Sequence, residues 1–351
     1  MNLIYFLIIL GVIVLVHEFG HFIMAKLFNV YVFEFAIGMG PKIFEIKGKE
    51  TVYSIRLLPL GGFVSLAGEE DQIEKSKEIP EDRLLNNKKI YQRFLIMVFG
   101  VVNNFILAFI IFFMVFLFNG SQSQSTKIVD VEKDTPAYYS GLMKNDTIIG
   151  INYDKVTTQD DMNLIMFLEK NEKLTFVVRR NEKIEFITVT PEKIKEKING
   201  KEIERYRYGI SLNTKKETGF VNAIKNSYLK IKSNVKSIIK VFQMLFKGKL
   251  GINAFSGPVG IYNVVKDQSK TNGFLGLVVL TAILSINVGF LNLLPFPIFD
   301  GGKIFFLIIE KIFNKKIDSK IELTLSLIFA VILIIFTIYI TGIDIWKMIK
   351  K

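Results

Sequence analysis

The stretch Val16-His17-Glu18-Phe19-Gly20-His21-Phe22 lies near the end of an apolar run that begins at Leu3, and it contains both histidines of the chain. In a helix, residues four apart lie on one face about one turn from each other, so His17 and His21 would stand together with Glu18 beside them. Two imidazoles so placed can bind zinc while the carboxylate handles a proton of a water molecule. Ionisable groups are costly in an apolar segment, which favours a metal site over two histidines that meet by chance near a helix end.

The composition is that of a membrane protein. Of the 351 residues, 50% are hydrophobic and 32 are phenylalanine, and long runs carry no charge. The chain has no cysteine, which excludes disulfides, thiolate zinc sites and cysteine nucleophiles. The net charge of +12 comes from lysines spread over loops and one amphipathic stretch, so we interpret it as topology signals and contacts with lipid headgroups. We therefore expect membrane lipid, and no nucleic acid, among the partners.

Four segments are long enough to cross a bilayer as helices, namely residues 3–28, 94–118, 274–299 and 323–343. We expect the first to be retained rather than removed as a signal peptide, because no lysine or arginine precedes it and it leads directly into the histidine motif. Basic residues before the second segment, and between the third and fourth, place residues 29–92 and 309–320 in the cytoplasm and both termini outside. Three lysines at the C-terminal end oppose this orientation.

Residues 42–66 differ from the apolar spans around them. Two short β-runs flank Lys47-Gly48-Lys49, which predicts a hairpin that Pro59 and Gly61-Gly62 close. A hairpin this apolar must be buried in protein or line a wet cavity, because open strand edges are not stable in lipid. Its edge at 43–57 could pair with an unwound substrate strand, or the hairpin could be a plug that covers the water path.

Residues 121–213 form the one sizeable soluble stretch, long enough for one small core. We expect β-strands at 128–131, 147–151, 174–179, 184–190 and 208–212, and a helix at 159–168. Apolar residues then recur at alternating spacings of four and three across Phe220–Phe246, with lysines on the other faces. This pattern predicts an amphipathic helix that lies on the membrane surface, and a coiled coil with a partner is the alternative.

A catalytic zinc has three protein ligands and one open position. With no further histidine and no cysteine, the third ligand must be an acid. Asp300 is the acid at the edge of the third span, in the sequence Asn292-Leu293-Leu294-Pro295-Phe296-Pro297-Ile298-Phe299-Asp300. The prolines prevent a regular helix there, and irregular backbone at membrane depth is tolerated only where it lines a cavity. The alternative is an aspartate that caps a helix at the membrane surface.

Together the motifs resemble the site-2 protease family of intramembrane zinc metalloproteases, in particular the bacterial regulator of sigma-E protease group, over nearly the whole chain. The resemblance rests on His17-Glu18-Phe19-Gly20-His21 and on Asn292-x-x-Pro295-x-Pro297-x-x-Asp300-Gly301. Similar segments also occur at Gly38-Met39-Gly40-Pro41, Pro59-Leu60-Gly61-Gly62-Phe63 and Ser256-Gly257-Pro258-Val259-Gly260, and residues 135–142 resemble the start of a PDZ domain. Two positions depart from the pattern, since Gly100-Val101-Val102-Asn103 lacks a proline after the glycine and Phe299 stands where leucine is usual.

The resemblance implies hydrolysis of peptide bonds inside the membrane. His17, His21 and Asp300 would hold Zn²⁺, Glu18 would be the base, and Asn292 would help to stabilise the oxyanion. We expect substrate contacts at Ile43, Val52, Ile55, Gly61, Asn103, Pro295 and Pro297. The implied substrates are single-pass membrane proteins already shortened by another protease and then cut in the bacterial inner (cytoplasmic) membrane.

The expected fold is a polytopic α-helical membrane protein with a membrane-associated β-hairpin and an inserted α+β PDZ-like domain on the outer face. Its expected parts are residues 1–120 and 263–351 as the two halves of a membrane protease core, 121–213 as the PDZ-like domain, and 214–262 as an amphipathic helix and linker. The competing function is a non-enzymatic membrane PDZ scaffold or a transporter whose histidines bind a structural or transported metal, which would have no need of Glu18. A membrane zinc protease that cuts soluble tails is another alternative, but it does not predict the proline-broken third span.

Overall fold

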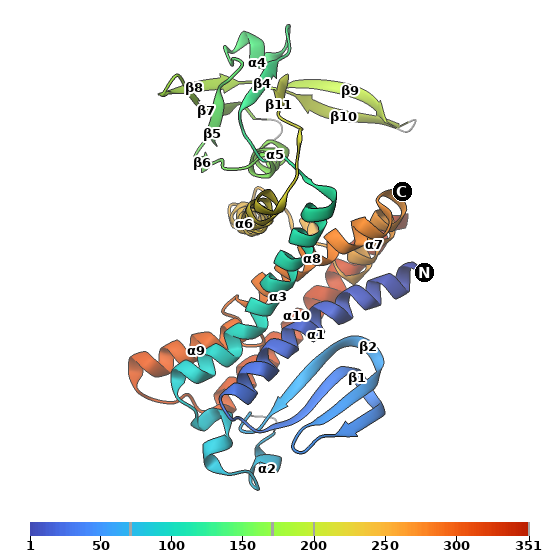
Figure 1. The fold of residues 1–351 in the computed structure, drawn as a ribbon, viewed down its shortest axis with the longest axis vertical. Helices are drawn as coiled ribbons and strands as arrows, with labels where there is room; N and C mark the ends of the chain where they lie inside the picture. Colours follow the sequence, from blue (N-terminus) through green and yellow to red (C-terminus); the bar gives the residue numbers. More distant parts are fainter. Residues whose placement is uncertain (70–71, 170–171, 199–200, 350–351) are drawn as a thin grey trace. The chain divides into compact units, whose positions relative to one another are not determined.

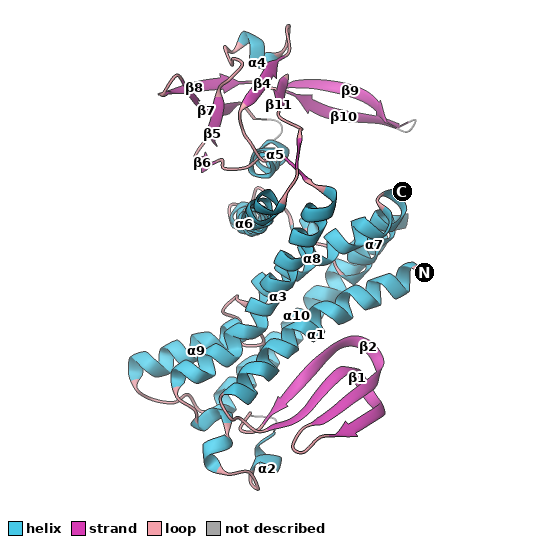
Figure 2. Ribbon diagram, viewed as in Figure 1, coloured by secondary structure: helices cyan, strands magenta, loops and turns pink. Residues whose placement is uncertain are grey.

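Four helices in the described part of the chain are long and apolar enough to cross a membrane. They are α1 (Asn2–Leu27), α3 (Ile90–Asn119), α8 (Gly273–Asn292) and α10 (Ser319–Ile349), drawn in Figures 1 and 2. The computed structural model describes residues 1–69, 72–169, 172–198 and 201–349. The chain divides into two units, Met1–Ile111 together with Val241–Lys351, and Phe112–Lys240. Each apolar run that predicted a membrane span is therefore present as a helix.

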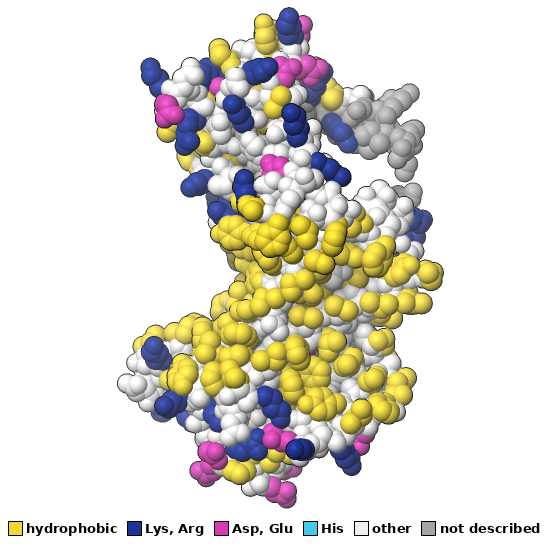
Figure 3. All heavy atoms as spheres, viewed as in Figure 1, with side chains coloured by type: hydrophobic (Ala, Val, Ile, Leu, Met, Phe, Trp, Pro, Cys, Tyr) yellow, Lys and Arg dark blue, Asp and Glu magenta, His cyan; other side chains and the backbone are white. Residues whose placement is uncertain are grey.

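In the first unit, both ends of α1 pack against other elements. Near its start, Ile9 and Ile13 are buried against α7 (Pro258–Thr271) and α8. Near its end, Met24 and Ala25 pack against α3 and the strand that follows α1. Figure 3 shows hydrophobic side chains over much of the visible face of these helices, and charged side chains gathered around α2 (Ile73–Ser76). Apolar surface of this extent outside the core is expected of helices that face lipid.

Helix α8 ends at Asn292, so the apolar run to Phe299 is not helical throughout, as the prolines predicted. Pro295 and Pro297 have no N–H to donate and disfavour helical backbone in the residue before them, so residues 293–299 turn. The chain becomes helical again at Asp300, the first residue of α9 (Asp300–Phe313). Gly301 and Gly302 permit the tight turn, because a Cβ at either would lie 2.3 Å from the carbonyl oxygen of Leu293 or 2.2 Å from that of Phe296.

The last membrane helix, α10, carries a buried carboxylate. Asp344 is 5% exposed, and its Oδ2 accepts hydrogen bonds of 2.8 Å from the N–H groups of Gly257 and Gly260. These N–H groups belong to the start of α7, where the first turn of a helix leaves donors without a partner. The segment 256–260, which resembles a family motif, thus binds the Asp344 carboxylate of α10 through its backbone N–H groups. Helix α10 therefore contributes a polar contact as well as apolar surface.

A β-sheet follows α1 directly. It consists of β1 (Val32–Lys47) and β2 (Val52–Leu66), which are two long bent strands joined at residues 48–51. The segment Glu34–Ile37 pairs with Gly62–Ser65 on one side and with Val52–Ile55 on the other, and 52–56 also pairs with 42–47. The sheet therefore has two outer edges, one at 42–47 and one at 62–66. The predicted hairpin around Lys47-Gly48-Lys49 is confirmed by the pairing of 42–47 with 52–56. Residues 59–62 continue β2, however, so the prediction that they close this hairpin is wrong.

Between the sheet and α3, the chain forms α2 and two short 3-10 turns, Glu81–Arg83 and Leu85–Asn87. Backbone hydrogen bonds tie this segment to the start of β1 and the end of β2, since Tyr31 N–H donates to the Arg83 carbonyl and Leu85 N–H to the Ala67 carbonyl. The segment is thus built onto the sheet.

The second unit contains an α+β core. A sheet of order β6-β5-β7-β8 and a separate β4–β11 pair share one core with helix α5 (Gln159–Leu168) and the short α4 (Pro136–Tyr139). The strands are β3 (Ser121–Gln122), β4 (Ile128–Val131), β5 (Thr147–Ile151), β6 (Asp154–Lys155), β7 (Leu174–Arg180), β8 (Lys183–Val189), β11 (Ile210–Leu212) and β12 (Lys216–Glu217). Fully buried Ile128, Ile148 and Phe176 lie in its core. The sequence did not predict the charged hairpin β9 (Glu192–Ile198) and β10 (Lys201–Arg207).

Helix α6 (Phe220–Phe246) is amphipathic as expected, but three lysines of its polar face bind protein carboxylates. Lys230 Nζ lies 2.7 Å from Asp160, Lys236 Nζ lies 2.7 Å from Asp161, and Lys240 pairs with Asp154. These lysines hold α6 against α5 and β6, and residues up to Lys240 belong to the second unit. These three lysines therefore serve packing within the second unit, which neither a role at lipid headgroups nor a coiled coil predicts.

Candidate metal centre

Helix α1 brings the two histidines together, as the spacing predicted. His17 and His21 are 7% and 8% exposed, and their Nε2 atoms are 3.2 Å apart. The two rings meet edge to face, with centroids 4.8 Å apart. Both residues lie on the side of α1 that packs against α3, where Gly20 and Gly100 allow the two backbones to approach closely, since a Cβ on Gly20 would lie 2.2 Å from the Phe99 carbonyl oxygen.

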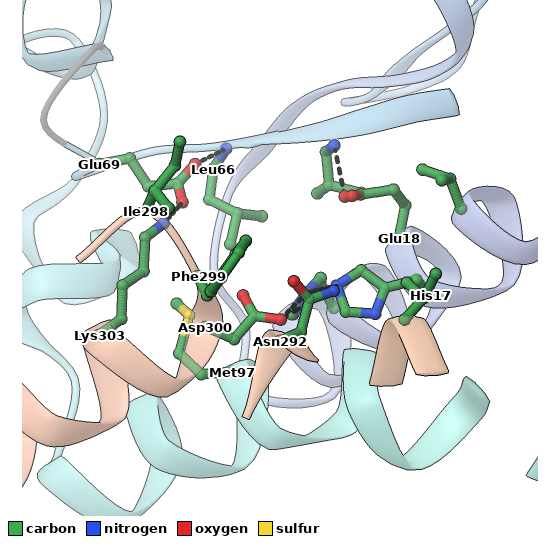
Figure 4. Close-up of a pocket in the computed structure, with 14 residues that line it drawn as sticks. His17, Glu18, Leu66, Glu69, Met97, Asn292, Ile298, Phe299, Asp300 and Lys303 are labelled. Atoms are coloured by element: carbon green, nitrogen blue, oxygen red, sulfur yellow. Dashed lines mark hydrogen bonds and ion pairs between the residues drawn. The ribbon is translucent and has the colours of Figure 1, made fainter. Parts of the chain in front are cut away.

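Asp300, at the start of α9, completes the cluster. Its Oδ2 lies 3.0 Å from His17 Nε2 and 3.4 Å from His21 Nε2. Figure 4 shows this carboxylate pointing toward the His17 ring. The structure thus unites the three residues that we predicted as ligands, and they form a group that could hold a metal ion.

The geometry of this group fits zinc. Metal–ligand distances of about 2.0–2.2 Å in a tetrahedral site separate the ligand atoms by roughly 3.3–3.6 Å, and the three atoms here are 3.0, 3.2 and 3.4 Å apart. Among the described residues, Asp300 Oδ2 is buried and accepts no hydrogen bond, which is a costly state for a carboxylate oxygen without a cation. Two imidazoles and one carboxylate are also a ligand set that catalytic zinc sites use.

Neighbouring groups orient both imidazoles for ligation through Nε2. His21 Nδ1 lies 2.8 Å from the carbonyl oxygen of Ile96, so it carries the proton and leaves Nε2 free. His17 Nδ1 lies 3.3 Å from the side-chain amide of Asn104, whose Oδ1 is buried and has no partner among the described residues. When Nε2 of His17 binds a metal, Nδ1 is protonated and becomes a donor. With the Asn104 amide turned so that Oδ1 faces His17, Oδ1 accepts this hydrogen bond, and both the Nδ1–H and Oδ1 gain a partner.

Glu18 and Asn292 line the same cavity of about 280 Å³ as the three ligands. The Glu18 carboxylate reaches β2, where its Oε2 accepts a hydrogen bond of 3.2 Å from Val64 N–H. Asn292, the last residue of α8, places Nδ2 3.4 Å from His17 Nε2. A base and an amide donor therefore stand beside the ligand cluster without belonging to it.

The predicted substrate-binding residues lie elsewhere. None of the predicted residues lines the cavity, that is, Ile43, Val52, Ile55, Gly61, Asn103, Pro295 and Pro297. Ile43 and Ile55 are 64% and 47% exposed and belong to the part of the sheet near the outer edge at 42–47. Asn103 donates to the Val16 carbonyl, so it joins α3 to α1. The strand that borders the cavity is instead the edge at 62–66, with the side chains of Val64 and Leu66.

Two further residues of the cavity were missed by sequence reasoning. Glu69 follows β2, and its carboxylate accepts from Leu66 N–H at 3.0 Å and from Lys303 Nζ at 3.1 Å. Lys303 lies one helical turn after Asp300. The negative charge of Glu69 raises the pKa of the Lys303 ammonium group above its ordinary value. The spacing from Asp300 to Lys303 is visible in the sequence as an i, i+3 pair, but Glu69 had no such signal.

Comparison with known proteins points to one family. Residues 5–336 match Peptidase family M50. A "Putative zinc metalloprotease" of Fusobacterium nucleatum is 35% identical over 356 residues, covering 97% of this chain and 97% of its own length. A protein of the same printed name from Clostridium acetobutylicum is 33% identical over 335 residues, covering 95% of this chain and 94% of its own length. Another from Staphylococcus aureus is 29% identical over 425 residues, covering 98% of this chain and 98% of its own length.

Proposed function

Because the chain belongs to peptidase family M50 and is a zinc-dependent membrane protease by that membership, we propose that it cleaves peptide bonds within the transmembrane segments of other membrane proteins. The observation that carries this proposal is the position of the ligand cluster. His17 and His21 lie in a helix long and apolar enough to span a membrane, and Asp300 lies just beyond the end of another. A protease whose site opens beside lipid-facing helices suits substrates that are themselves in the membrane.

The residues of the cavity can share the work of hydrolysis. His17, His21 and Asp300 would hold the zinc ion, which when bound polarises a carbonyl and makes water a stronger nucleophile. Glu18 would take the proton from the attacking water and later give it to the leaving amine. Asn292 Nδ2 would donate a hydrogen bond to the substrate carbonyl oxygen as negative charge develops there.

A substrate helix must unwind before it is cut, because its carbonyl groups are otherwise hydrogen-bonded inside the helix. We propose that the unwound segment pairs with the edge of β2 at 62–66, since this edge borders the cavity that contains Glu18 and Asp300. The other edge, at 42–47, would then be free to act as the plug that we considered for the hairpin.

The remaining assignments follow the family resemblance. We propose that the α+β core of the second unit is a PDZ-like domain on the outer face of the bacterial inner membrane, where it admits single-pass substrates already shortened by another protease. The ion pairs that join α6 to α5 and β6 make this filter a single body with its helix.

The substitution Glu18→Gln tests the proposal. It should retain zinc in the purified protein, because no ligand is lost, and it should abolish cleavage of a single-pass model substrate. Mass spectrometry of the products then identifies the bond that the wild-type protein cuts. A cut within the apolar segment supports the proposal, whereas a cut only in a soluble tail contradicts it. Wild-type cleavage by Glu18→Gln would exclude Glu18 as the base. Absence of cleavage by the wild-type protein itself would favour a metal-binding scaffold or transporter.

A further inference from the structure

We propose that the substrate-facing edge of β2 is capped by two carboxylates, Glu18 and Glu69, and that a substrate strand must displace both in order to bind. Displacement would free Glu18 at the moment the substrate arrives, so binding and release of the base are coupled. Glu69 is then a positioning residue of this edge. The inference rests on the proposed function, in which an unwound substrate pairs with this edge.

The two hydrogen bonds occupy the backbone donors that a new strand would need. Val64 N–H donates to Glu18 Oε2 at 3.2 Å, and Leu66 N–H donates to Glu69 Oε2 at 3.0 Å. In a strand, residues two apart direct their N–H groups to the same side. Because both N–H groups donate to side chains, they point away from the ladder that β2 makes with β1. Figure 4 shows both carboxylates reaching the strand from the cavity below it.

Open edges invite pairing with any extended chain, and proteins commonly guard them with charged side chains. Here the guards are carboxylates, which accept hydrogen bonds but cannot donate them, so they match exposed N–H groups. Glu69 is held in place by Lys303, whose Nζ donates to the other carboxylate oxygen at 3.1 Å. Among the described residues no lysine or arginine pairs with Glu18, whose contact on the strand is the N–H of Val64.

A substrate strand has carbonyl groups at the spacing of these two donors. One carbonyl would replace Glu18 at Val64, and another would replace Glu69 at Leu66, with no change in the number of hydrogen bonds to β2. Glu69 keeps its ion pair with Lys303 after displacement. Glu18 keeps no partner on β2 and turns toward the ligand cluster beside it, where its proton-transfer role lies. An enzyme without substrate would thus hold its base away from the metal.

Disulfide crosslinking tests this without requiring catalysis. The chain has no cysteine, so Val64→Cys adds a single thiol on the strand while leaving its N–H in place. A single-pass model substrate with one cysteine at successive positions is added to protein freed of zinc by a chelator. Strand pairing predicts crosslinks at alternate substrate positions. In the Val64→Cys background, Glu69→Ala and Glu18→Ala should each raise the yield at sub-saturating substrate about three- to tenfold, the value of one net hydrogen bond.

Three comparisons make the result specific. Glu69→Gln should raise the yield less than Glu69→Ala, because the glutamine carbonyl still accepts from Leu66 N–H. Glu45→Gln, on the opposite edge of the sheet, should leave it unchanged. Amide hydrogen exchange in the substrate-free protein should accelerate at Leu66 in Glu69→Ala and at Val64 in Glu18→Ala, which separates uncapping from general loosening of the sheet.

The proposal is overturned if alternate positions crosslink but neither alanine variant raises the yield, or if Glu69→Ala lowers it, since Glu69 would then support the bound strand. Absence of crosslinks in every variant also overturns it, because no strand would dock on this edge. In either case proteolysis itself is judged separately, by the loss of cleavage in Glu18→Gln with cysteine-free protein.

Discussion

The substitution Gly100→Ala should weaken zinc binding although Gly100 is not a ligand. Gly100 lies in α3 opposite the histidines, and a methyl group there would lie 2.3 Å from His21 Nε2 and 2.9 Å from His17 Cε1. Non-bonded carbon atoms prefer separations of about 3.5–4.0 Å. The ring of His21, or the whole of α3, must therefore move by roughly 1 Å to accept the methyl group.

The size of the effect follows from this displacement. Zinc sites tolerate deviations of only about 0.2 Å in ligand distance. The ring of His21, displaced by roughly 1 Å, must therefore return to its position each time a zinc ion binds. Overpacking a rigid site costs about 1–3 kcal/mol, which corresponds to a loss of roughly 5- to 150-fold in zinc affinity. Cleavage at limiting zinc should fall by a similar factor and recover partly when zinc is added in excess.

Zinc affinity can be measured by competition with a chromogenic chelator in detergent micelles. The matched control is Gly342→Ala in α10, because a Cβ at Gly342 meets no atom within 4 Å. Both variants add one methyl group to a membrane helix, so the control reports any general effect on folding or purification. Wild-type zinc affinity in Gly100→Ala would refute the close packing of α3 against the two histidines.

Three further predictions concern other residues. Asp300→Ala should lower zinc occupancy together with activity, and full zinc content with lost activity would show that Asp300 is not a ligand. Asn104→Ala should weaken zinc about 10- to 100-fold, because His17 loses the group that orients it, and unchanged affinity would contradict this role. Burial by itself raises the pKa of Asp161, but hydrogen bonds from Lys236 and neighbouring groups hold it below its ordinary value. The stability that Asp161 contributes is thus present above its unfolded pKa and lost as pH falls through the folded pKa. The melting temperature of the full-length protein between about pH 6 and pH 3 should therefore depend less on pH in Asp161→Asn than in the wild type. Equal pH dependence in the variant and the wild type would refute this role of Asp161.

The features that sequence could predict depend on local signals. Long apolar runs indicate the membrane helices, and two histidines one turn apart remain together in any helix. Asp300 was predictable because the prolines before it break the helix and few acids lie near a span. These inferences need no knowledge of which helix packs on which.

The remaining features depend on long-range pairing. Helix α3 is apolar on all sides, so its sequence does not reveal that Asn104 rather than Asn103 faces His17. The bent strands β1 and β2 place Glu34–Ile37 between two partners, and this register is not encoded in alternation alone. The edge at 62–66 consequently borders the cavity, whereas the sequence favoured the edge at 43–57. Glu69 could be recognised only after that edge was placed.

The position of Asp344 ties the membrane insertion of α10 to the parts of the chain made before it. A carboxylate costs about 2.5–3.5 kcal/mol when it enters the centre of a membrane helix, and less toward the end. The N–H groups of Gly257 and Gly260 that receive it are synthesised some 84–87 residues earlier. The last helix therefore integrates most favourably once α7 is in place, and a precursor without α7 would leave the Asp344 carboxylate without these two donors.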